Sequence, residues 1–495
     1  MKTYRFLTLL FLTLVGTTLH AQTLNVNVGN VTYLHSAANV GDMTFGTNTA
    51  GSATLTIEGM TYTLSDVSSM EVADNSYDDN QVSVTYNGNT ATVAMSGNLA
   101  SKIGVSIDGA NVRLVQEANA TINAVSYVLS GTSSNGSFYM EGTHTAALTL
   151  NNLTLTSTNG AAIDIQDGKK TNIYLQGSTT LADAANGTHN ACFYIDGGGT
   201  ISGDGSLTIT GNTKHGFSAD EALIIQEGTG TITVTNAVAD GFHLSENLQM
   251  NGGTVNITAA GDGLDLGFRG VNKGTKDNYE NNGFVFINGG TLTINSTGNA
   301  AKGLKCDSTC IVSGGSLDIT VSGAAYYDAT EADITSSSAL KPAGDFNMTG
   351  GTISLKATGA GGKGLNADGN IDISGGDMTI VTMGARYKYN SELDTKPQGM
   401  KCDGSISLTG GNVKVAVTDA KATACKTDVS LMINGASVFC IGGKSFAPSL
   451  GSQSYKTYSN QMFIGGNSYI MDGITFNLPT GYSNTAAFVL TSAAQ

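Results

Sequence analysis

Apolar and polar residues alternate over short stretches of this chain, and Gly, Asn or Asp separates one stretch from the next. Such alternation is typical of a half-buried β-strand, because successive side chains of a strand point to opposite faces. One pattern, apolar-x-Gly-Gly-x-apolar-x-apolar, occurs as MNGGTVNI, INGGTLTI, VSGGSLDI, MTGGTISL, ISGGDMTI and LTGGNVKV. The chain therefore repeats a unit of short strands and tight turns.

The repeat has a regular length of 23–25 residues, which some copies extend by about 11–13. The second glycines of the pattern are Gly253, Gly290, Gly315, Gly351, Gly376 and Gly411, and degenerate copies centre on Gly205, Gly230 and Ala436. About twelve residues before most of these positions another strand begins, as in KGLKCD from Lys302 and QGMKCD from Gln398. A unit of this size holds about three strands and cannot bury its apolar face alone, but stacked copies share one core.

These features predict an all-β fold in which the units stack as a parallel β-helix, with neighbouring coils about 4.8 Å apart. A leucine-rich repeat has a similar length, but its Leu-x-x-Leu-x-Leu-x-x-Asn frame is absent from this sequence. The β-helix is therefore the favoured fold.

The ends of the chain differ from the repeat. Lys2 and Arg5 precede a short apolar stretch that ends near Ala21, which predicts a signal peptide over 1–21 and a secreted protein, whether periplasmic, cell-surface or extracellular. We expect a β-rich N-terminal region and cap over 22–124, the β-helix over 125–447 and a C-terminal β cap over 448–495. The remaining sequence has no apolar run of the ~20 residues that span a bilayer, so we expect no membrane insertion.

Composition narrows the choice of partner. The chain has 65 Gly but 4 Pro, and 39 acidic against 24 basic residues give a formal charge of −15. Such an acidic protein is a poor partner for nucleic acid or an anionic membrane. Binding an acidic ligand would require a cation or a local basic patch. The six Cys mostly fall at apolar positions of the repeat, which favours buried free thiols, although Cys402 and Cys425 could pair if they lie on neighbouring coils.

When the units stack, residues at the same position of successive repeats lie next to one another and form a row on the surface. Outward positions of the KGLKCD-type strand place Lys305, Lys341, Lys401 and Lys426 in one row. Carboxylates gather beside this row and just upstream of it, and a row of like charges invites a cation such as Ca²⁺, which takes 6–8 oxygen ligands. The candidate ligands are Asp240, Asp262, Asp265, Asp307, Asp368 and Asp403.

Both rows have simpler explanations. Asp before Gly is favourable in a turn, and alternating Lys and Asp residues form weak surface ion pairs. A zinc site is not supported, because the six His and six Cys show no ligand spacing.

Inserted segments at 268–282, 325–337 and 385–397 flank the same strand and suggest the walls of a groove. Aromatic and basic residues on such loops suit sugar stacking and carboxylate pairing, although the tyrosines could instead pack the loops down. The candidates are Tyr279, Tyr326, Tyr327, Arg386, Tyr387 and Tyr389. No Ser-His-Asp order, phosphate-binding loop or dinucleotide motif occurs in the right context, so we name no catalytic residue.

An ordered series of strings, including YVLSGTSSNGSFYMEGTHTAALTLNNLTL, ADGFHLSENLQMNGGTVNIT and KGLNADGNIDISGG, resembles a family of secreted bacterial carbohydrate-binding proteins. That family is similar to right-handed parallel β-helices of the pectate-lyase type, and the resemblance covers about residues 125–447. It implies binding of Ca²⁺ and of cellulose or an acidic polysaccharide such as polygalacturonate. The positions that match its Asp-Gly motifs are Asp240, Asp262, Asp368 and Asp403, whereas Ser245, Ala343 and Thr427 depart from the pattern.

The leading hypothesis is a monomeric, non-catalytic protein that binds polysaccharide through a Ca²⁺-dependent groove. One alternative is a polysaccharide lyase, in which Ca²⁺ acidifies the proton beside a uronate carboxylate and Lys305, Lys341 or Lys401 removes it. A second alternative is a surface adhesin or a structural solenoid.

Overall fold

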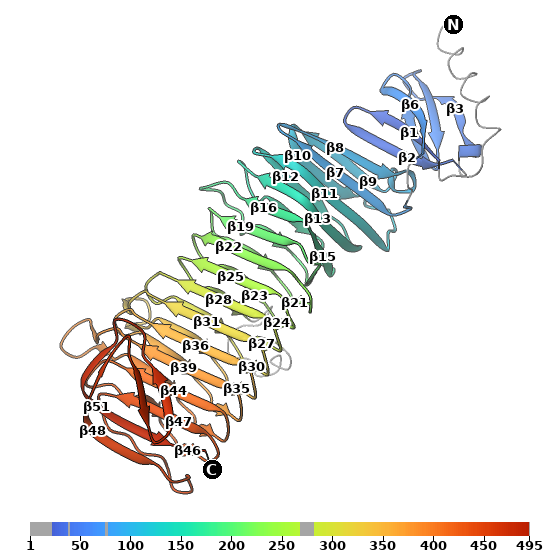
Figure 1. Ribbon diagram of the computed structural model, residues 1–495. Coiled ribbons are helices and arrows are strands. Elements are labelled where there is room, and N and C mark those ends of the chain that lie inside the picture. Colours follow the sequence, from blue (N-terminus) through green and yellow to red (C-terminus); the bar gives the residue numbers. More distant parts are fainter. Residues whose placement is uncertain (1–21, 38–39, 75–77, 268–281, 495) are drawn as a thin grey trace.

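The computed structural model describes residues 22–37, 40–74, 78–267 and 282–494. The predicted signal peptide and Tyr279 lie outside these residues. Within them the strands stack along one long axis, with the N-terminal strands at one end and the C-terminal strands at the other (Figure 1). The predicted all-β fold and the parallel stacking of the repeat are confirmed.

From β14 onward, each coil of the stack contributes one strand to each of three ladders. In the first ladder β9 and β10 are antiparallel and all later neighbours are parallel. Its strands are β9 (Ile103–Asp108), β10 (Ala110–Gln116), β12 (Gly136–Glu141), β14 (Ile163–Gln166), β17 (Ala191–Ile195), β20 (His215–Ala219), β23 (Phe242–Ser245), β26 (Leu264–Gly267), β29 (Lys302–Cys306), β34 (Ser338–Pro342), β37 (Lys363–Ala367), β42 (Gln398–Cys402) and β45 (Cys425–Thr427).

The second and third ladders are parallel throughout and meet at β13 (Thr145–Thr156), which pairs with both. The second contains β15 (Thr171–Gln176), β18 (Gly199–Ser202), β21 (Leu223–Ile225), β24 (Asn247–Met250), β27 (Phe284–Ile287), β30 (Cys310–Val312), β35 (Phe346–Met348), β38 (Ile371–Ile373), β43 (Ile406–Leu408) and β46 (Leu431–Ile433). The third contains β16 (Ser178–Ala182), β19 (Ser206–Gly211), β22 (Thr231–Ala237), β25 (Thr254–Ala259), β28 (Thr291–Ser296), β31 (Ser316–Val321), β36 (Thr352–Ala357), β39 (Asp377–Thr382), β44 (Asn412–Val417) and β47 (Ser437–Gly442).

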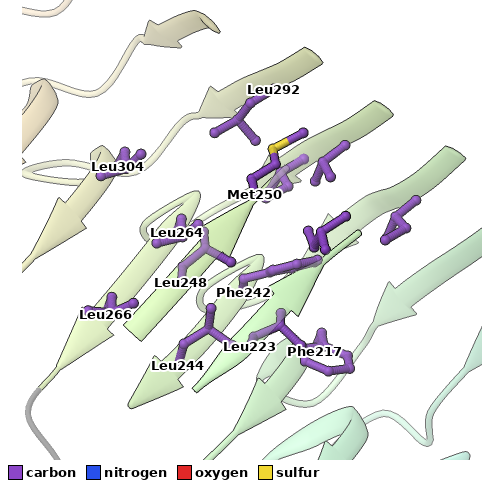
Figure 2. Packing of buried hydrophobic residues seen from close by; sticks show 14 of the residues in the cluster. Phe217, Leu223, Phe242, Leu244, Leu248, Met250, Leu264, Leu266, Leu292 and Leu304 are labelled. Atoms are coloured by element: carbon purple, nitrogen blue, oxygen red, sulfur yellow. The ribbon is translucent and has the colours of Figure 1, made fainter. Parts of the chain in front are cut away.

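The inward residues of the three ladders form one core along the stack. Phe217, Phe242 and Leu264 follow one another in register on successive coils (Figure 2), and all three are buried. All six cysteines are buried free thiols, as predicted.

The second glycine of each Gly-Gly pattern lies at a corner between ladders, where φ is between 75° and 84°. Residues with a Cβ atom reach this left-handed region at a cost of about 1–2 kcal/mol, which explains why glycine repeats there.

The N-terminal region has two parts. Its first strands enclose a small separate core that includes Leu24, Val26 and Leu55, whereas the core of the stack already begins at Val82. The elements of this region are β1 (Thr23–Val28), β2 (Val31–Ser36), η1 (Val40–Asp42), β3 (Thr44–Thr47), β4 (Ala53–Ile57), β5 (Met60–Thr63), β6 (Val67–Ala73), β7 (Gln81–Asn87), β8 (Thr90–Ser96) and η2 (Gly97–Leu99). Strand β7 joins the stack by pairing in parallel with β11 (Ala124–Ser133), which pairs in turn with β13.

The C-terminal end of the stack is covered by β48 (Lys456–Ile464), β49 (Ser468–Met471), β50 (Ile474–Asn477) and β51 (Ser483–Ser492). Strand β51 pairs antiparallel with β47 and β48. In the insertions before β34 and β42 lie two hairpins, β32 (Tyr326–Asp328) with β33 (Asp333–Thr335), and β40 (Tyr387–Lys388) with β41 (Asp394–Thr395). Among the described residues, no helix has the length and apolar character needed to cross a membrane.

Candidate functional site

The outward side of the first ladder forms one continuous face, which we call the first-ladder face. The central outward residue of each strand is in register with that of the next strand, so these side chains form a column. The column is Arg113, Tyr139, Asp164, Tyr194, Ser218, His243, Asp265, Lys305, Lys341, Asn366, Lys401 and Lys426. At about 4.8 Å per strand, the column is about 50 Å long.

The predicted lysine row forms the C-terminal half of this column. Lys305 Nζ lies 2.7 Å from Asp265 Oδ1, Lys401 Nζ lies 2.9 Å from Asp403 Oδ1, and Lys341 is paired with Asp368. The carboxyl side chains of Asp368 and Asp403 are 46% and 51% exposed, so these pairs are weak and open to exchange with a ligand. Lys426, at the C-terminal end of the row, is exposed. Asp307, which follows β29, is half-buried.

Burial lowers the pKa of Lys305, but the nearby Asp265 carboxylate outweighs burial and the net shift is upward. Lys305 therefore stays protonated, which suits it to bind anions rather than to act as a base.

The two hairpins stand beside this row and contact each other. The rings of Tyr327 and Tyr389 stack with centroids 3.8 Å apart, and Arg386 is paired with Asp394 inside its own hairpin. These contacts match the alternative in which the loop residues pack the loops down. Tyr326 and Tyr389 are nevertheless 39% and 51% exposed, and Tyr387 is half-buried.

Lys363 lies beneath the hairpins, and sequence reasoning did not single it out as a site residue. Its Nζ donates to Ser336 Oγ at 2.5 Å and to Thr395 Oγ1 at 3.3 Å. Burial, followed by the charge of Lys401, lowers its pKa to about 8. A buried ammonium group that titrates near neutral pH is a candidate base.

The upstream carboxylates Asp240, Asp262 and Asp265 are engaged with protein groups. Asp240 Oδ1 accepts the backbone N–H of Asp262 at 2.8 Å, and Asp262 Oδ1 accepts that of Lys302 at 2.7 Å. Burial and the charges of Asp240 and Asp265 raise the pKa of Asp262 to about 6.

The free sides of Asp240 and Asp265 face imidazole groups, since His243 Nδ1 lies 3.3 Å from an oxygen of each. Most oxygens of these carboxylates are thus engaged with N–H groups, Lys305 or imidazoles, which leaves too few for Ca²⁺, which needs 6–8 oxygens.

The N-terminal half of the column carries tyrosines that the sequence reasoning missed, because the repeat is degenerate there. The Arg113 guanidinium lies 3.8 Å from the centre of the Tyr139 ring, and the Tyr194 hydroxyl donates to Asp220 Oδ2 at 2.8 Å. Next to Tyr139 is an open hollow of about 500 Å³ with Asn159, Asp164 and His189 in its lining. One repeat upstream of Ser218 leads to Tyr194, but the next step, to Asp164, is longer than the repeat, so counting repeats does not reach Tyr139 or Arg113.

Comparison with known proteins identifies the family. A model of carbohydrate-binding domain-containing proteins matches residues 108–384 and 346–444. The chain belongs to this family of carbohydrate-binding proteins. The matched residues include the whole central column of the first-ladder face, from Arg113 to Lys426, so the family assignment and the face concern the same part of the molecule.

One solved structure is similar over a shorter part of the chain. It is described as the polysaccharide lyase-like protein from C. thermocellum in a gadolinium derivative, and it is 22% identical. The match covers 54% of this chain and 96% of that chain with a TM-score of 0.42. No curated protein matches this chain.

Proposed function

We propose that this protein is a secreted, monomeric and non-catalytic protein that binds an acidic polysaccharide, such as polygalacturonate, along the first-ladder face of a right-handed parallel β-helix. The observation that carries the proposal is the column itself. A polysaccharide is long in one direction, and the column offers polar, cationic and aromatic side chains at regular steps over about 50 Å, interrupted at the buried Ser218. Lys305, Lys341 and Lys401 supply the local basic row that an otherwise acidic protein needs for an anionic ligand.

We propose that Ca²⁺ binds at Asp307, Asp368 and Asp403. Each of these carboxylates follows a first-ladder strand, and the exposure of Asp368 and Asp403 leaves oxygens available to an ion. One carboxylate offers too few oxygens for Ca²⁺ alone. A uronate carboxylate and its hydroxyl groups would complete the ligand set, so the ion would bridge protein and sugar.

Isothermal titration with polygalacturonate, in Ca²⁺ and again in a Ca²⁺ chelator, tests this proposal. We expect binding in Ca²⁺, at least tenfold weaker binding in the chelator, and little binding of a fully methyl-esterified polymer, which has no carboxylates. Absence of binding to any acidic polysaccharide would contradict the function. Equal binding in Ca²⁺ and chelator would contradict only the role of the ion.

Lys363 favours polysaccharide lyase as a second candidate function. A lyase base must release its proton near neutral pH, and the lowered pKa of Lys363 meets that condition, whereas Lys305 and Lys401 are ion-paired. Lys363 is 9% exposed, so the hairpins would have to move for it to reach a sugar. Absorbance of unsaturated products during incubation with pectin, lost in Lys363→Met, would favour the lyase over the binding protein.

A further inference from the structure

Two imidazole rings meet on the first-ladder face at the point where β20, β23 and β26 stack. His215 begins β20 and His243 lies in β23, on the next coil. Their rings are stacked with centroids 4.2 Å apart and an interplanar angle of 13°. Asp240 precedes β23 and Asp265 lies in β26, so two carboxylates from neighbouring coils reach the same place.

The distances in this cluster differ from those of ordinary ion pairs. Asp240 Oδ2 lies 3.2 Å from His215 Nδ1 and 3.3 Å from His243 Nδ1, and Asp265 Oδ2 also lies 3.3 Å from His243 Nδ1. Charge-assisted N–H···O bonds are about 2.7–2.9 Å long, and the pair of His189 and Asp183 in this same protein is 2.6 Å. His243 Nδ1 is shielded from solvent, and within the described part of the protein its two 3.3 Å contacts lack the geometry of a good hydrogen bond.

The distances between the donor atoms fit a metal ion at the centre of the cluster once the ring of His243, whose side chain is 40% exposed, turns out of the stack so that its Nδ1 lone pair points at the ion. Nitrogen and oxygen ligands of a tetrahedral ion lie about 2.0–2.1 Å from it, which places them about 3.3–3.4 Å from one another. One atom each from His215, Asp240 and His243 lies within 4.8 Å of the other two. The backbone N–H of Asp240 is 3.2 Å from His215 Nδ1, and this is the contact that an ion would replace.

Further contacts hold the ligand atoms in position. The Asp262 N–H donates a hydrogen bond to Asp240 Oδ1 at 2.8 Å, and Lys305 Nζ donates one to Asp265 Oδ1 at 2.7 Å. The ring of His215 is 3% exposed and fixed by burial. Such second contacts are what orient the ligands of a metal site before the ion arrives.

We propose that His215, Asp240 and His243 form a binding site for a divalent transition-metal ion such as Zn²⁺, with Asp265 in reach of the fourth position. Imidazole nitrogens with one or two carboxylates suit Zn²⁺ or Co²⁺, whereas Ca²⁺ and Mg²⁺ require sets of oxygens. The ion would connect three successive coils. The proposal does not depend on polysaccharide binding or on the exposed Ca²⁺ positions.

Titration of the purified, chelator-treated protein with Co²⁺ tests the site, because tetrahedral Co²⁺ has intense visible absorption bands and hydrated Co²⁺ has weak ones. We expect the intense bands to saturate at one equivalent, to disappear when one equivalent of Zn²⁺ is added, and to persist in excess Ca²⁺. The variant His243→Ser should weaken Co²⁺ binding by about 100-fold or more, since loss of even an outer contact costs 10–100-fold. Serine occupies the same register position one coil earlier, at Ser218, so the coil should tolerate it.

His189→Ser is the matched control, because it removes a histidine that is paired with a carboxylate outside the cluster. It should leave the bands unchanged. Weak bands in the unaltered protein, equal bands in His243→Ser, or equal losses in both variants would overturn the proposal. Circular dichroism of both variants distinguishes loss of the ligand from loss of the fold.

Discussion

Lys363 shows how the environment of one residue sets its chemistry. In the described part of the chain its ammonium group donates hydrogen bonds to the hydroxyls of Ser336 and Thr395. The positive charges of Lys401 and Lys302 lie near it. Hydroxyl groups compensate a buried charge less well than a carboxylate does. The folded protein therefore favours the neutral amine, and its pKa falls from 10.5 to about 8.

The lowered pKa predicts a specific dependence of stability on pH. Between pH 8 and 10.5 the unfolded chain binds the Lys363 proton more tightly than the folded chain, so the free energy of unfolding should rise with pH in this range. Lys363→Met should reduce the rise to the contribution of Lys302, whose pKa burial also lowers, and stabilise the protein at pH 7 by up to about 3 kcal/mol, which corresponds to the pKa shift of Lys363. Chemical denaturation at several pH values measures both effects. Lys356→Met, at a half-buried lysine of β36, should keep the full rise, and an undiminished rise in Lys363→Met would contradict the assignment of the lowered pKa to Lys363.

The sequence predicted residues of the regular coils and missed contacts between different columns. The register Asp265–Lys305–Lys341 follows from counting repeats. The stacking of His215 on His243 cannot be found by counting repeats, because the two residues occupy different positions of the repeat. Their separation along the chain also resembles no metal-binding motif. Tyr327 and Tyr389 likewise meet only because two insertions of different sequence fold back over the same coil.

At the scale of the strand and its corner, the Gly-Gly pattern is explained by two separate constraints. Gly351 has a φ of 83°, and a Cβ atom there would lie 2.7 Å from the carbonyl oxygen of Gly314 on the preceding coil. The first constraint is backbone conformation, and the second is the close approach of stacked coils. The sequence shows that glycine recurs at this corner, but it does not show whether the backbone conformation or the close approach of the coils requires it.

Two substitutions separate these constraints. Gly228 has a φ of 75° but open space around the position of a Cβ atom, so Gly228→Ala should cost only the backbone strain of about 1–2 kcal/mol. Gly351→Ala should cost clearly more, because the coils must also separate. Thermal unfolding of the two variants gives the comparison, and equal losses would show that the approach of the coils contributes nothing.

At the scale of the whole molecule, the stack must be closed at its ends, since an open coil exposes unpaired strand edges and core side chains. Strand β51 covers β47, and Phe439 packs against Phe463 and Phe476 of the C-terminal strands. The end of the repeat predicts a cap over 448–495. It does not predict the antiparallel pairing, which depends on contacts distant in the chain.

Removal of residues 448–495 should therefore cause self-association. The freed edge of β47 and the uncovered Phe439 would pair with another copy of the chain. Light scattering after size-exclusion chromatography should show a monomer for the intact protein and larger species for the shortened one. A shortened protein that stays monomeric and folded would contradict the assigned role of these strands.

The central claim is that acidic polysaccharide lies on the first-ladder face, and two matched double variants test it most directly. Lys341 and Lys401 lie on this face, whereas Lys356 and Lys414 lie on the third ladder of the same two coils. Lys341→Ala with Lys401→Ala removes the same charge as Lys356→Ala with Lys414→Ala. Hydrogen bonds to charged groups contribute about 1.5–3 kcal/mol each, and every 1.4 kcal/mol is about tenfold in affinity.

The measurement is the Kd for polygalacturonate, determined by isothermal titration in Ca²⁺. We predict that the first pair of substitutions weakens binding tenfold or more and that the second pair leaves it within about twofold of the unaltered protein. Equal losses in the two double variants, or no loss in the first, would contradict the placement of the polysaccharide on the first-ladder face.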